Sequence, residues 1–197
     1  LNETNNEERK MSEQNLIIPR RSFFAAAGRT TLSAGAVLLL AGCAGDKAAM
    51  AADPANDVNI LNSALGAEQE AIAAYQVGAE SGLLSKPVLD LAVQFQGHHK
   101  EHAEVLAKTV SDLGGTPHEA MAQYDFPTDQ LNTEADVLRF AAGLEKGAVS
   151  AYLGAVPLFA ERELAKAAAS ILGDEAMHWA VLRGALGENP VPVAFVS

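Results

Sequence analysis

The sequence predicts an all-α fold, a bundle of four helices arranged as two antiparallel helical hairpins joined by a long crossover. Three observations favour this fold. From residue 57 onward no run of residues alternates between apolar and polar side chains as a strand would. Four long segments are bounded by residues that typically start or stop helices. The second pair of segments also repeats the residue pattern of the first pair.

Each expected helix has a recognisable boundary. Pro87 suits the first turn of the second helix, where Ser85 can act as the cap. Thr133 and Asp136 have the spacing of a capping box at the start of the third helix. Gly187 follows the fourth helix. The helices are therefore expected at about residues 57–78, 86–113, 133–156 and 161–186.

The lengths of the links predict how the helices are connected. Short links join the first helix to the second and the third to the fourth, which makes two antiparallel hairpins. The middle link has about twenty residues and contains Gly114, Gly115, Pro117 and Pro127, so it cannot be one tight turn. It allows the third helix to start again at the far end of the bundle.

Residues 1–42 are typical of an export signal that is cleaved. Arg20 and Arg21 precede a moderately apolar run over 25–41, which resembles a twin-arginine signal. Pro19 departs from the usual pattern, and this leaves open the choice between the twin-arginine and the general secretory routes. A short membrane anchor is the alternative, although a spanning helix needs about 20 apolar residues. Residues 1–10 are interpreted as an upstream extension, with Met11 as the more natural start.

The apolar run ends in Leu-Ala-Gly-Cys, which matches the lipobox of bacterial lipoproteins, so we expect Cys43 to be acylated. Residues 43–56 are expected to form a lipidated flexible tether, 57–187 the bundle, and 188–197 a C-terminal tail. Cys43 is the single cysteine, so no disulfide can hold the fold. These features predict an exported protein anchored by lipid to a membrane that faces the periplasm or the extracellular side.

The charge balance excludes one class of partner. The chain has 25 acidic and 14 basic residues, and removal of residues 1–42 takes away 4 and 5 of them, which leaves 21 and 9 and a net charge of −12. Such a surface argues against binding nucleic acid or anionic lipid head groups. It is compatible with attracting metal cations.

Matching residues recur in the two predicted hairpins. Residues 61–75 and 138–152 are identical at seven of fifteen positions, at a spacing of 77. Residues 97–102 align with 173–178 at a spacing of 76. The two hairpins therefore follow one plan. The carboxylate and imidazole residues found at equivalent positions are Glu68 and Glu145, His99 and Glu175, and His102 and His178.

These residues are of kinds that bind metal ions, and the helices should bury them. Residues three apart share one face of a helix, so Glu175 and His178 can bind the same ion. Glu68 and Glu145 have small or apolar neighbours on their own faces. Buried carboxylates are costly without partners, and they repel one another when they face each other. The sequence therefore predicts a paired-metal site between the helices.

The pattern over about residues 57–187 resembles the ferritin-like superfamily, in which two helices each contribute a Glu and the other two each contribute a Glu-x-x-His pair. The resemblance implies that Glu68 and Glu145 are single, bridging carboxylates. It implies that Glu175 and His178 form the complete pair and that His102 is the histidine of the second helix. It also implies iron as the cofactor, with two ions, and it allows manganese.

One position departs from that pattern, because His99 stands where a Glu is expected. Either the site gains a nitrogen ligand and loses a negative charge, or only one ion binds firmly. His98 is an alternative ligand, since it shares a face with His102. The alternative interpretation of this histidine-rich run is a solvated helix face that binds no metal. Tyr75 and Tyr152 are interpreted as core residues, with a redox role or a contact to the ligands as the alternative.

The resemblance predicts a metal-binding lipoprotein with a di-iron or mixed iron and manganese site, acting in metal oxidation or oxidant defence at the cell envelope. It leaves open whether the protein is an enzyme, and it allows oxidoreductase chemistry of the ferroxidase or peroxidase kind. The alternative is a metal-free helical bundle with a structural or interaction role. A storage cage is a weaker alternative, because a lipid tether would hinder assembly. The sequence leaves a homodimer open.

Overall fold

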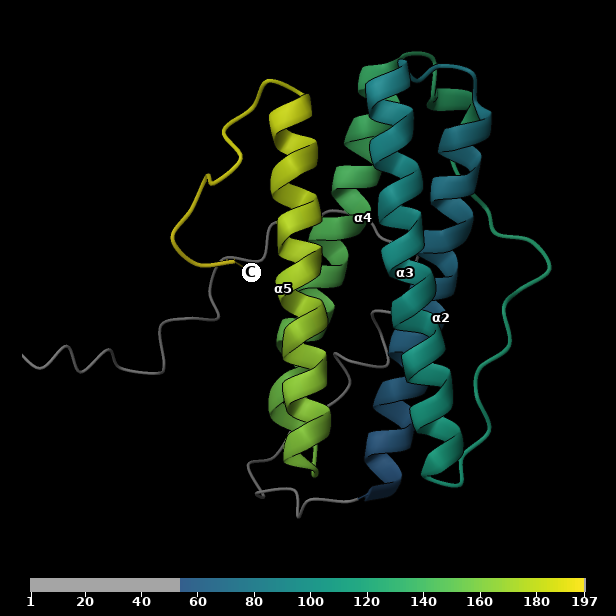
Figure 1. Cartoon of the computed structure of the whole chain (residues 1–197), viewed down its shortest axis with the longest axis vertical. Coiled ribbons are helices and arrows are strands. Elements are labelled where there is room, and N and C mark those ends of the chain that lie inside the picture. The colour runs from purple at the N-terminus through teal and green to yellow at the C-terminus, as the bar shows by residue number, and fades with distance from the viewer. Residues whose placement is uncertain (1–53, 197) are drawn as a thin grey trace, which may run out of the picture. The chain divides into compact units, whose positions relative to one another are not determined.

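The computed structural model of the protein describes residues 54–196, in which four long helices form a bundle (Figure 1). No strand occurs within these residues, so the predicted all-α four-helix fold is confirmed. Two short 3-10 helices, η1 (Thr128–Gln130) and η2 (Val156–Leu158), lie in the links before and after the third long helix. The long helices are α2 (Pro54–Glu80), α3 (Lys86–Asp112), α4 (Glu134–Ala155) and α5 (Arg162–Ala185).

The predicted signal over 1–42, the acylated Cys43 and the tether up to residue 53 lie outside the described residues. The end of the tether needs a correction, because α2 already begins at Pro54, three residues before the expected start at Asp57. Proline is well suited to a first helical turn, since the N–H that it lacks would have no partner within the helix. Across the part of the chain that the structure describes, no helix is both long and apolar enough to span a membrane.

The helices pair as the link lengths predict. Helix α2 packs against α3 and α4 packs against α5, and most contacts between helices fall within these two hairpins. The crossover between α3 and α4 runs along the outside of the bundle from one end to the other (Figure 1). Each hairpin therefore places its two helices antiparallel, and α4 starts at the same end as α3.

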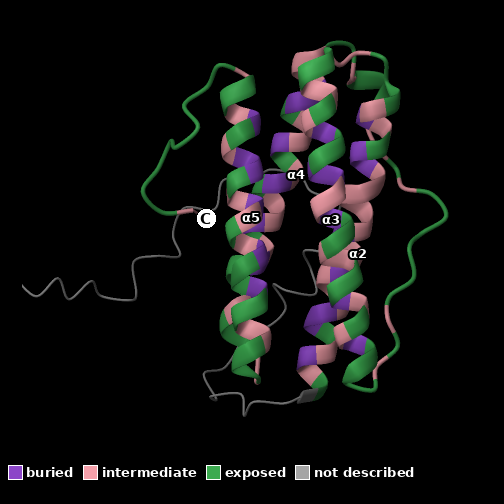
Figure 2. Ribbon diagram, in the orientation of Figure 1, coloured by how far each residue is buried: buried purple, intermediate pink, exposed green. Residues whose placement is uncertain are grey.

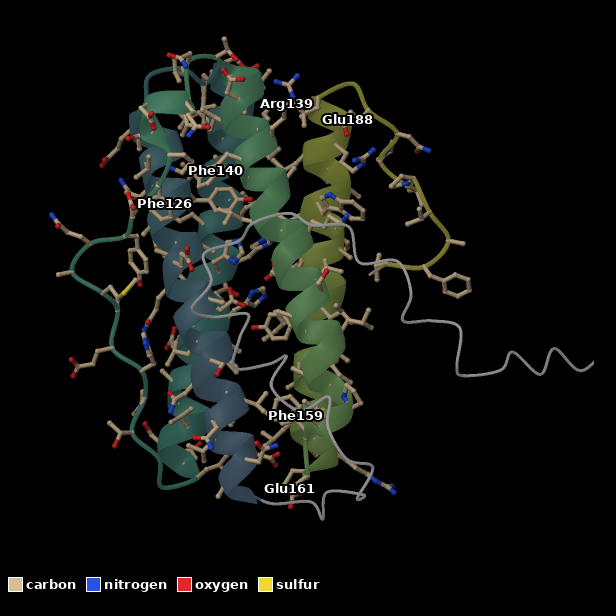
Figure 3. All side chains as sticks on the ribbon, turned by 180° about the vertical axis from the view of Figure 1, so that it is seen from behind. Phe126, Arg139, Phe140, Phe159, Glu161 and Glu188 are labelled. Carbon is tan, nitrogen blue, oxygen red and sulfur yellow. The ribbon has the colours of Figure 1, made fainter. Side chains whose placement is uncertain are left out.

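The crossover is fixed to the bundle by polar and aromatic contacts. The side chain of Asn62 accepts a hydrogen bond from the backbone N–H of His118 at 2.8 Å. The side chain of Gln69 donates to the carbonyl of His118 at 2.9 Å. Farther along, Phe126 packs edge-on against Phe140 of α4, with ring centroids 5.8 Å apart (Figure 3). These contacts hold the long link along α2 and α4.

The helix starts follow the predicted signals in part. The capping box of Thr133 and Asp136 is confirmed, with both of its reciprocal hydrogen bonds present. Ser85 is the cap residue of α3, but its side chain makes no capping hydrogen bond. Its backbone N–H instead donates to the carboxylate of Glu134, at the start of α4. This hydrogen bond ties the first hairpin to the second.

Two apolar clusters fill the interior on either side of a polar middle, and Figure 2 shows the buried residues distributed along all four helices. Apart from Asp57 near the start of α2, the buried polar residues of each helix lie in sequence between members of the two clusters. Apolar packing therefore closes the polar middle at both ends. The first cluster consists of Leu61, Leu65, Leu106, Val110, Tyr152, Ala168 and Ile171. The second consists of Tyr75, Ala92, Phe95, Leu138, Ala142, Trp179 and Leu182.

Candidate metal centre

The structure brings all six predicted ligands together in the polar middle of the bundle. Helix α2 contributes Glu68, α3 contributes His99 and His102, α4 contributes Glu145, and α5 contributes Glu175 and His178. All of them are buried except His102, which is partly exposed. Their ligating atoms form two overlapping groups, and within each group these atoms lie within 4.8 Å of one another. Such a spacing allows one metal ion to contact a whole group.

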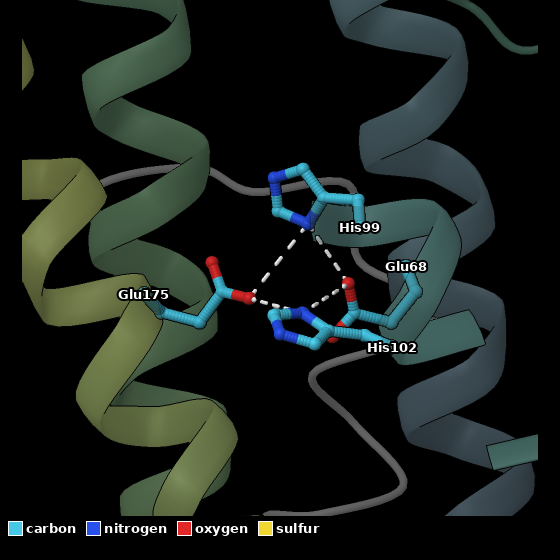
Figure 4. Close-up of side chains that lie close together, drawn as sticks. All are labelled: Glu68, His99, His102 and Glu175. Atoms are coloured by element: carbon cyan, nitrogen blue, oxygen red, sulfur yellow. Dashed lines mark hydrogen bonds and ion pairs between the residues drawn. The ribbon is translucent and has the colours of Figure 1, made fainter. Parts of the chain in front are cut away.

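The first group consists of Glu68, His99, His102 and Glu175 (Figure 4). Nδ1 of His99 lies 2.8 Å from Oε2 of Glu68 and 3.7 Å from Oε1 of Glu175. Nδ1 of His102 lies 3.5 Å from the same oxygen of Glu68 and 3.2 Å from the same oxygen of Glu175. Two carboxylates and two imidazoles therefore surround one position that a metal ion could occupy.

The second group consists of His99, Glu145, Glu175 and His178. Nε2 of His99 lies 3.3 Å from Oε1 of Glu145. Nδ1 of His178 lies 3.4 Å from that oxygen and 3.5 Å from Oε2 of Glu175. The two groups thus have the same composition, two carboxylates and two imidazoles.

Two residues belong to both groups. Glu175 presents Oε1 to the first group and Oε2 to the second. His99 presents Nδ1 to the first group and Nε2 to the second. The family resemblance implies that Glu68 and Glu145 are the bridging carboxylates, whereas the structure places each of these in one group and gives the shared position to Glu175 and His99. The physical reason is geometric. Among the predicted ligands, only His99 on α3 and Glu175 on α5 have two ligating atoms that face different groups.

Unsatisfied polar atoms provide a test of whether a metal fits here. Four buried side-chain atoms have no hydrogen-bond partner within the described residues: Nδ1 of His102, Nδ1 of His178 and both carboxylate oxygens of Glu175. Buried polar atoms without partners are costly and uncommon. All four belong to predicted ligands and face the two groups. Metal ions bound among them would satisfy all four atoms, so the residues fit a pair of ions.

The pKa values of the three predicted histidine ligands are strongly raised. Burial alone would lower the pKa of His99, but hydrogen bonds to Glu145 and Glu68 and the charges of Glu145 and Glu175 outweigh it and raise the pKa to about 10. Burial likewise opposes the acidic neighbours of His102 and His178, which raise each pKa to about 9. Without metal, imidazolium groups therefore balance the carboxylates at neutral pH.

The carboxylates show the opposite shift. Burial would raise the pKa of Glu68, but the adjacent imidazoles of His102 and His99 outweigh it and lower the pKa. Burial also opposes the adjacent imidazoles of His178 and His99, which hold the pKa of Glu145 far below its usual value. Both carboxylates therefore stay ionised. Ionised oxygen ligands are what hard cations such as Fe²⁺ and Mn²⁺ prefer.

Two tyrosines hold these carboxylates across the bundle. Tyr152 of α4 donates a hydrogen bond to Glu68 of α2 at 2.6 Å, and Tyr75 of α2 donates to Glu145 of α4. Both rings also belong to the apolar clusters. Burial and the adjacent carboxylates raise both tyrosine pKa values well above 10, which keeps the hydroxyls protonated as donors. The tyrosines are core residues, as the sequence predicts, and they also orient ligands.

Asp174 is a functional residue that the sequence analysis did not single out. Its Oδ2 lies 3.4 Å from Nε2 of His102 and 3.2 Å from Nε2 of His178. The Asp174 carboxylate attracts both Nε2 atoms, and Nε2 of His178 is hydrogen-bonded to Nδ1 of His98 at 2.9 Å, so that each Nδ1 faces the centre. The sequence does contain a signal for Asp174. This residue directly precedes Glu175 and aligns with His98 in the repeat. His98, considered as an alternative ligand, lies outside both inner groups and contacts Asp174 and His178.

Comparisons with known proteins agree with this architecture. The model of the ferritin-like domain family matches residues 56–188. A crystal structure of a conserved hypothetical protein from Mycobacterium tuberculosis superimposes with a TM-score of 0.63 and 24% identity, covering 73% of this chain and 99% of that chain. Ferritin-like, diiron-carboxylate proteins from Bacillus anthracis superimpose with a TM-score of 0.60 and 22% identity, covering 70% and 99%. Among curated proteins no match was found. The family match spans most of the chain, and the chain therefore belongs to the ferritin-like domain family.

Proposed function

We propose that this protein binds two metal ions between its four helices and uses them in oxidation chemistry at the cell envelope. Iron is the preferred metal in this proposal, and manganese is the second candidate. The observation that carries the proposal is the set of four unsatisfied buried atoms on His102, His178 and Glu175, which face two adjacent groups of ligands. The diiron-carboxylate character of the similar proteins from Bacillus anthracis supports iron. Bound metal ions would give all four atoms a ligating role, which no hydrogen bond among the described residues provides.

The donor set favours hard or borderline ions. The two groups offer three carboxylates and three imidazoles in all. Carboxylate oxygens suit Mn²⁺ and Fe²⁺, and imidazole adds affinity for iron. Two ferrous ions bound by these ligands would supply the two electrons that reduce one hydrogen peroxide, which with two protons would leave as two waters.

The chain's own residues prepare the centre for such chemistry. The two apolar clusters exclude water from both ends of it. Tyr75 and Tyr152 hold Glu145 and Glu68 in place through hydrogen bonds. Asp174 fixes the orientation of His102 and His178. Ligands that are held in this way do not need to reorganise when the charge at the centre changes.

The proposal includes export and lipidation at Cys43. The arginine pair, the apolar run and the lipobox in the sequence support it. The test is fractionation of bacteria that express the wild type and Cys43→Ala. We expect the wild type in the membrane fraction and the variant outside it, because the variant cannot be acylated. Equal membrane association of both would contradict lipidation.

Metal binding and reactivity are tested together on purified protein without its lipid. Anaerobic titration with Fe²⁺ is expected to saturate at about two ions per chain. Addition of one equivalent of peroxide should then oxidise both ions, monitored by absorbance of ferric iron. A chain that binds no iron or manganese would support the metal-free structural alternative. Binding without oxidation would leave a metal-binding protein and exclude the redox role.

A further inference from the structure

We propose that His98 and Asp174 form an outer cation site at the seam between α3 and α5, through which a divalent metal ion passes to the buried centre. The inference rests on the proposed function, because a loading site is useful only if the inner groups take up metal. His98 belongs to neither inner group, so this site is distinct from the paired-metal centre.

Ligating atoms from both helices converge at this seam. Oδ2 of Asp174 lies 3.3 Å from Nδ1 of His98 and 3.2 Å from Nε2 of His178. These two nitrogens are 2.9 Å apart. Together, His98, Asp174 and His178 form a third group whose ligating atoms lie within 4.8 Å of one another. Two imidazole nitrogens and a carboxylate oxygen form a donor set that binds divalent iron, manganese, cobalt or zinc.

Exposure rises stepwise from the centre to this group. The side chains of Glu175 and His178 are 0% and 2% exposed. Asp174 and His98 are 23% and 35% exposed. Contacts between α3 and α5 are sparse compared with those inside each hairpin. A cation that arrives from solvent at this seam can therefore reach His98 and Asp174 before the fully buried Glu175 and His178.

His178 connects the two sites, because one ring serves both. Its Nδ1 faces Glu145 and Glu175 inside, and its Nε2 faces His98 and Asp174 outside. An imidazole that ligates through Nδ1 keeps its proton on Nε2 and cannot bind a second ion there. The outer site therefore has three protein ligands before His178 binds an inner ion and two afterwards. Such a site holds an ion transiently, which suits transfer rather than storage.

A purely positioning role for this group makes a different prediction. Nε2 of His178 is hydrogen-bonded to Nδ1 of His98 at 2.9 Å and also lies 3.2 Å from Oδ2 of Asp174, so Asp174 still faces this nitrogen when His98 is removed. If His98 only supported His178, its removal would change the equilibrium affinity of the centre. If His98 belongs to a loading site, its removal slows uptake and leaves the final metal content unchanged.

The experiment follows Co²⁺ uptake by stopped-flow absorption of the protein-bound ion, with final content measured by equilibrium dialysis. Wild type is compared with His98→Ala and His98→Gln, and His118→Ala is the matched control because His118 is an exposed histidine in the crossover. Loss of a ligand or of its supporting partner lowers metal affinity by about 10–100-fold. Uptake below saturation follows occupancy of the outer site, so both His98 variants should load roughly tenfold more slowly.

The expected result is slow uptake in the His98 variants, wild-type rates in His118→Ala, and the same final cobalt content in all four proteins. Unchanged rates in both His98 variants would overturn the loading site while leaving the paired-metal centre intact. A lower final content in these variants would also overturn it, because His98 would then belong to the centre. A wild type that binds no cobalt would remove the proposed function itself. His98→Gln keeps the test valid if His98→Ala folds poorly.

Discussion

The hydroxyl of Tyr152 in α4 donates a hydrogen bond to Oε1 of Glu68 in α2, at 2.6 Å. The reciprocal hydrogen bond joins Tyr75 in α2 to Glu145 in α4. Each hairpin therefore supplies the tyrosine that holds the carboxylate of the other hairpin. The centre and the association of the two hairpins depend on the same buried hydrogen bonds.

Replacement of this hydroxyl should destabilise the protein. In Tyr152→Phe the carboxylate of Glu68 loses a buried donor, and the free energy of unfolding should fall by about 1–3 kcal/mol. Urea denaturation of the metal-free protein measures the change. Tyr124→Phe is the control, because Tyr124 lies in the crossover away from the centre. A loss for Tyr152→Phe no larger than that of the control would show that the hydrogen bond contributes nothing.

The stability of the metal-free protein should depend on alkaline pH. The pKa of His99 is raised from 6.5 to about 10, and those of His102 and His178 to about 9. A group whose pKa is higher in the folded state stabilises the fold fully below its unfolded pKa and loses this contribution as pH rises through its folded value. Urea denaturation should therefore show stability falling between pH 6.5 and about 10. A flat profile over this range would be inconsistent with buried imidazolium groups.

The same pKa values predict proton release on metal binding. Ligating imidazoles must be neutral, and the raised pKa values mean that they are protonated at neutral pH before an ion arrives. We expect Mn²⁺ addition at pH 7 to release protons, measured in weakly buffered solution with a pH indicator. His102→Gln should release fewer protons. Metal binding without proton release would mean that the histidines are not ligands.

Restoring the expected glutamate at position 99 tests the departure from the family pattern. His99→Glu replaces an imidazolium by a fourth carboxylate among Glu68, Glu145 and Glu175, and like charges buried together repel. The metal-free variant should lose about 3–5 kcal/mol of stability. Added Mn²⁺ should raise its thermal midpoint more than that of the wild type. Only the folded state binds the ions, and the fourth carboxylate attracts them more strongly. His99→Gln is the neutral control. An unchanged stability of metal-free His99→Glu would exclude a charge-balancing role for His99.

The junction between the hairpins depends on Asp57. Its buried carboxylate accepts hydrogen bonds from the backbone N–H groups of Ala160 at 2.8 Å and Glu161 at 3.1 Å, immediately before α5. Figure 3 shows Glu161 at the end of the bundle where α5 starts. Asp57→Ala should reduce the free energy of unfolding by about 1–3 kcal/mol. The exposed Asp112→Ala serves as the control in the same denaturation experiment. Equal stabilities of the two variants would contradict this role.

The sequence predicts the fold well because its signals are local. The capping box at Thr133 and the glycine after α5 lie within one turn of the helix ends that they mark. The link lengths then decide which helices pair, and the structure confirms both hairpins. The start of α2 was predicted three residues late because the Ala- and Pro-rich stretch before Asp57 also fits a flexible tether.

The site was predicted less completely, because its details depend on how the two hairpins face each other. The repeat identifies Glu68 and Glu145, but it does not tell which carboxylate both groups share. That property of Glu175 arises because its two oxygens face different histidines, His102 and His178, on different helices. Asp174 and the tyrosine hydrogen bonds were missed or left open for the same reason. The two tyrosine hydrogen bonds and the contact of Asp174 with His102 join residues at least 70 positions apart in the sequence. Only the contact of Asp174 with His178 is local.

Anomalous diffraction from crystals of the wild type soaked in Mn²⁺ would locate any ions bound between the four helices. We expect two ions, one bound by Nδ1 of His102 and the other by Nδ1 of His178, with Glu175 contacting both. Glu68→Ala and Glu145→Ala should weaken the first and the second ion respectively. An absence of anomalous density beside Glu175 in fully soaked crystals, or ions bound only at the surface, would show that the bundle holds no paired-metal centre.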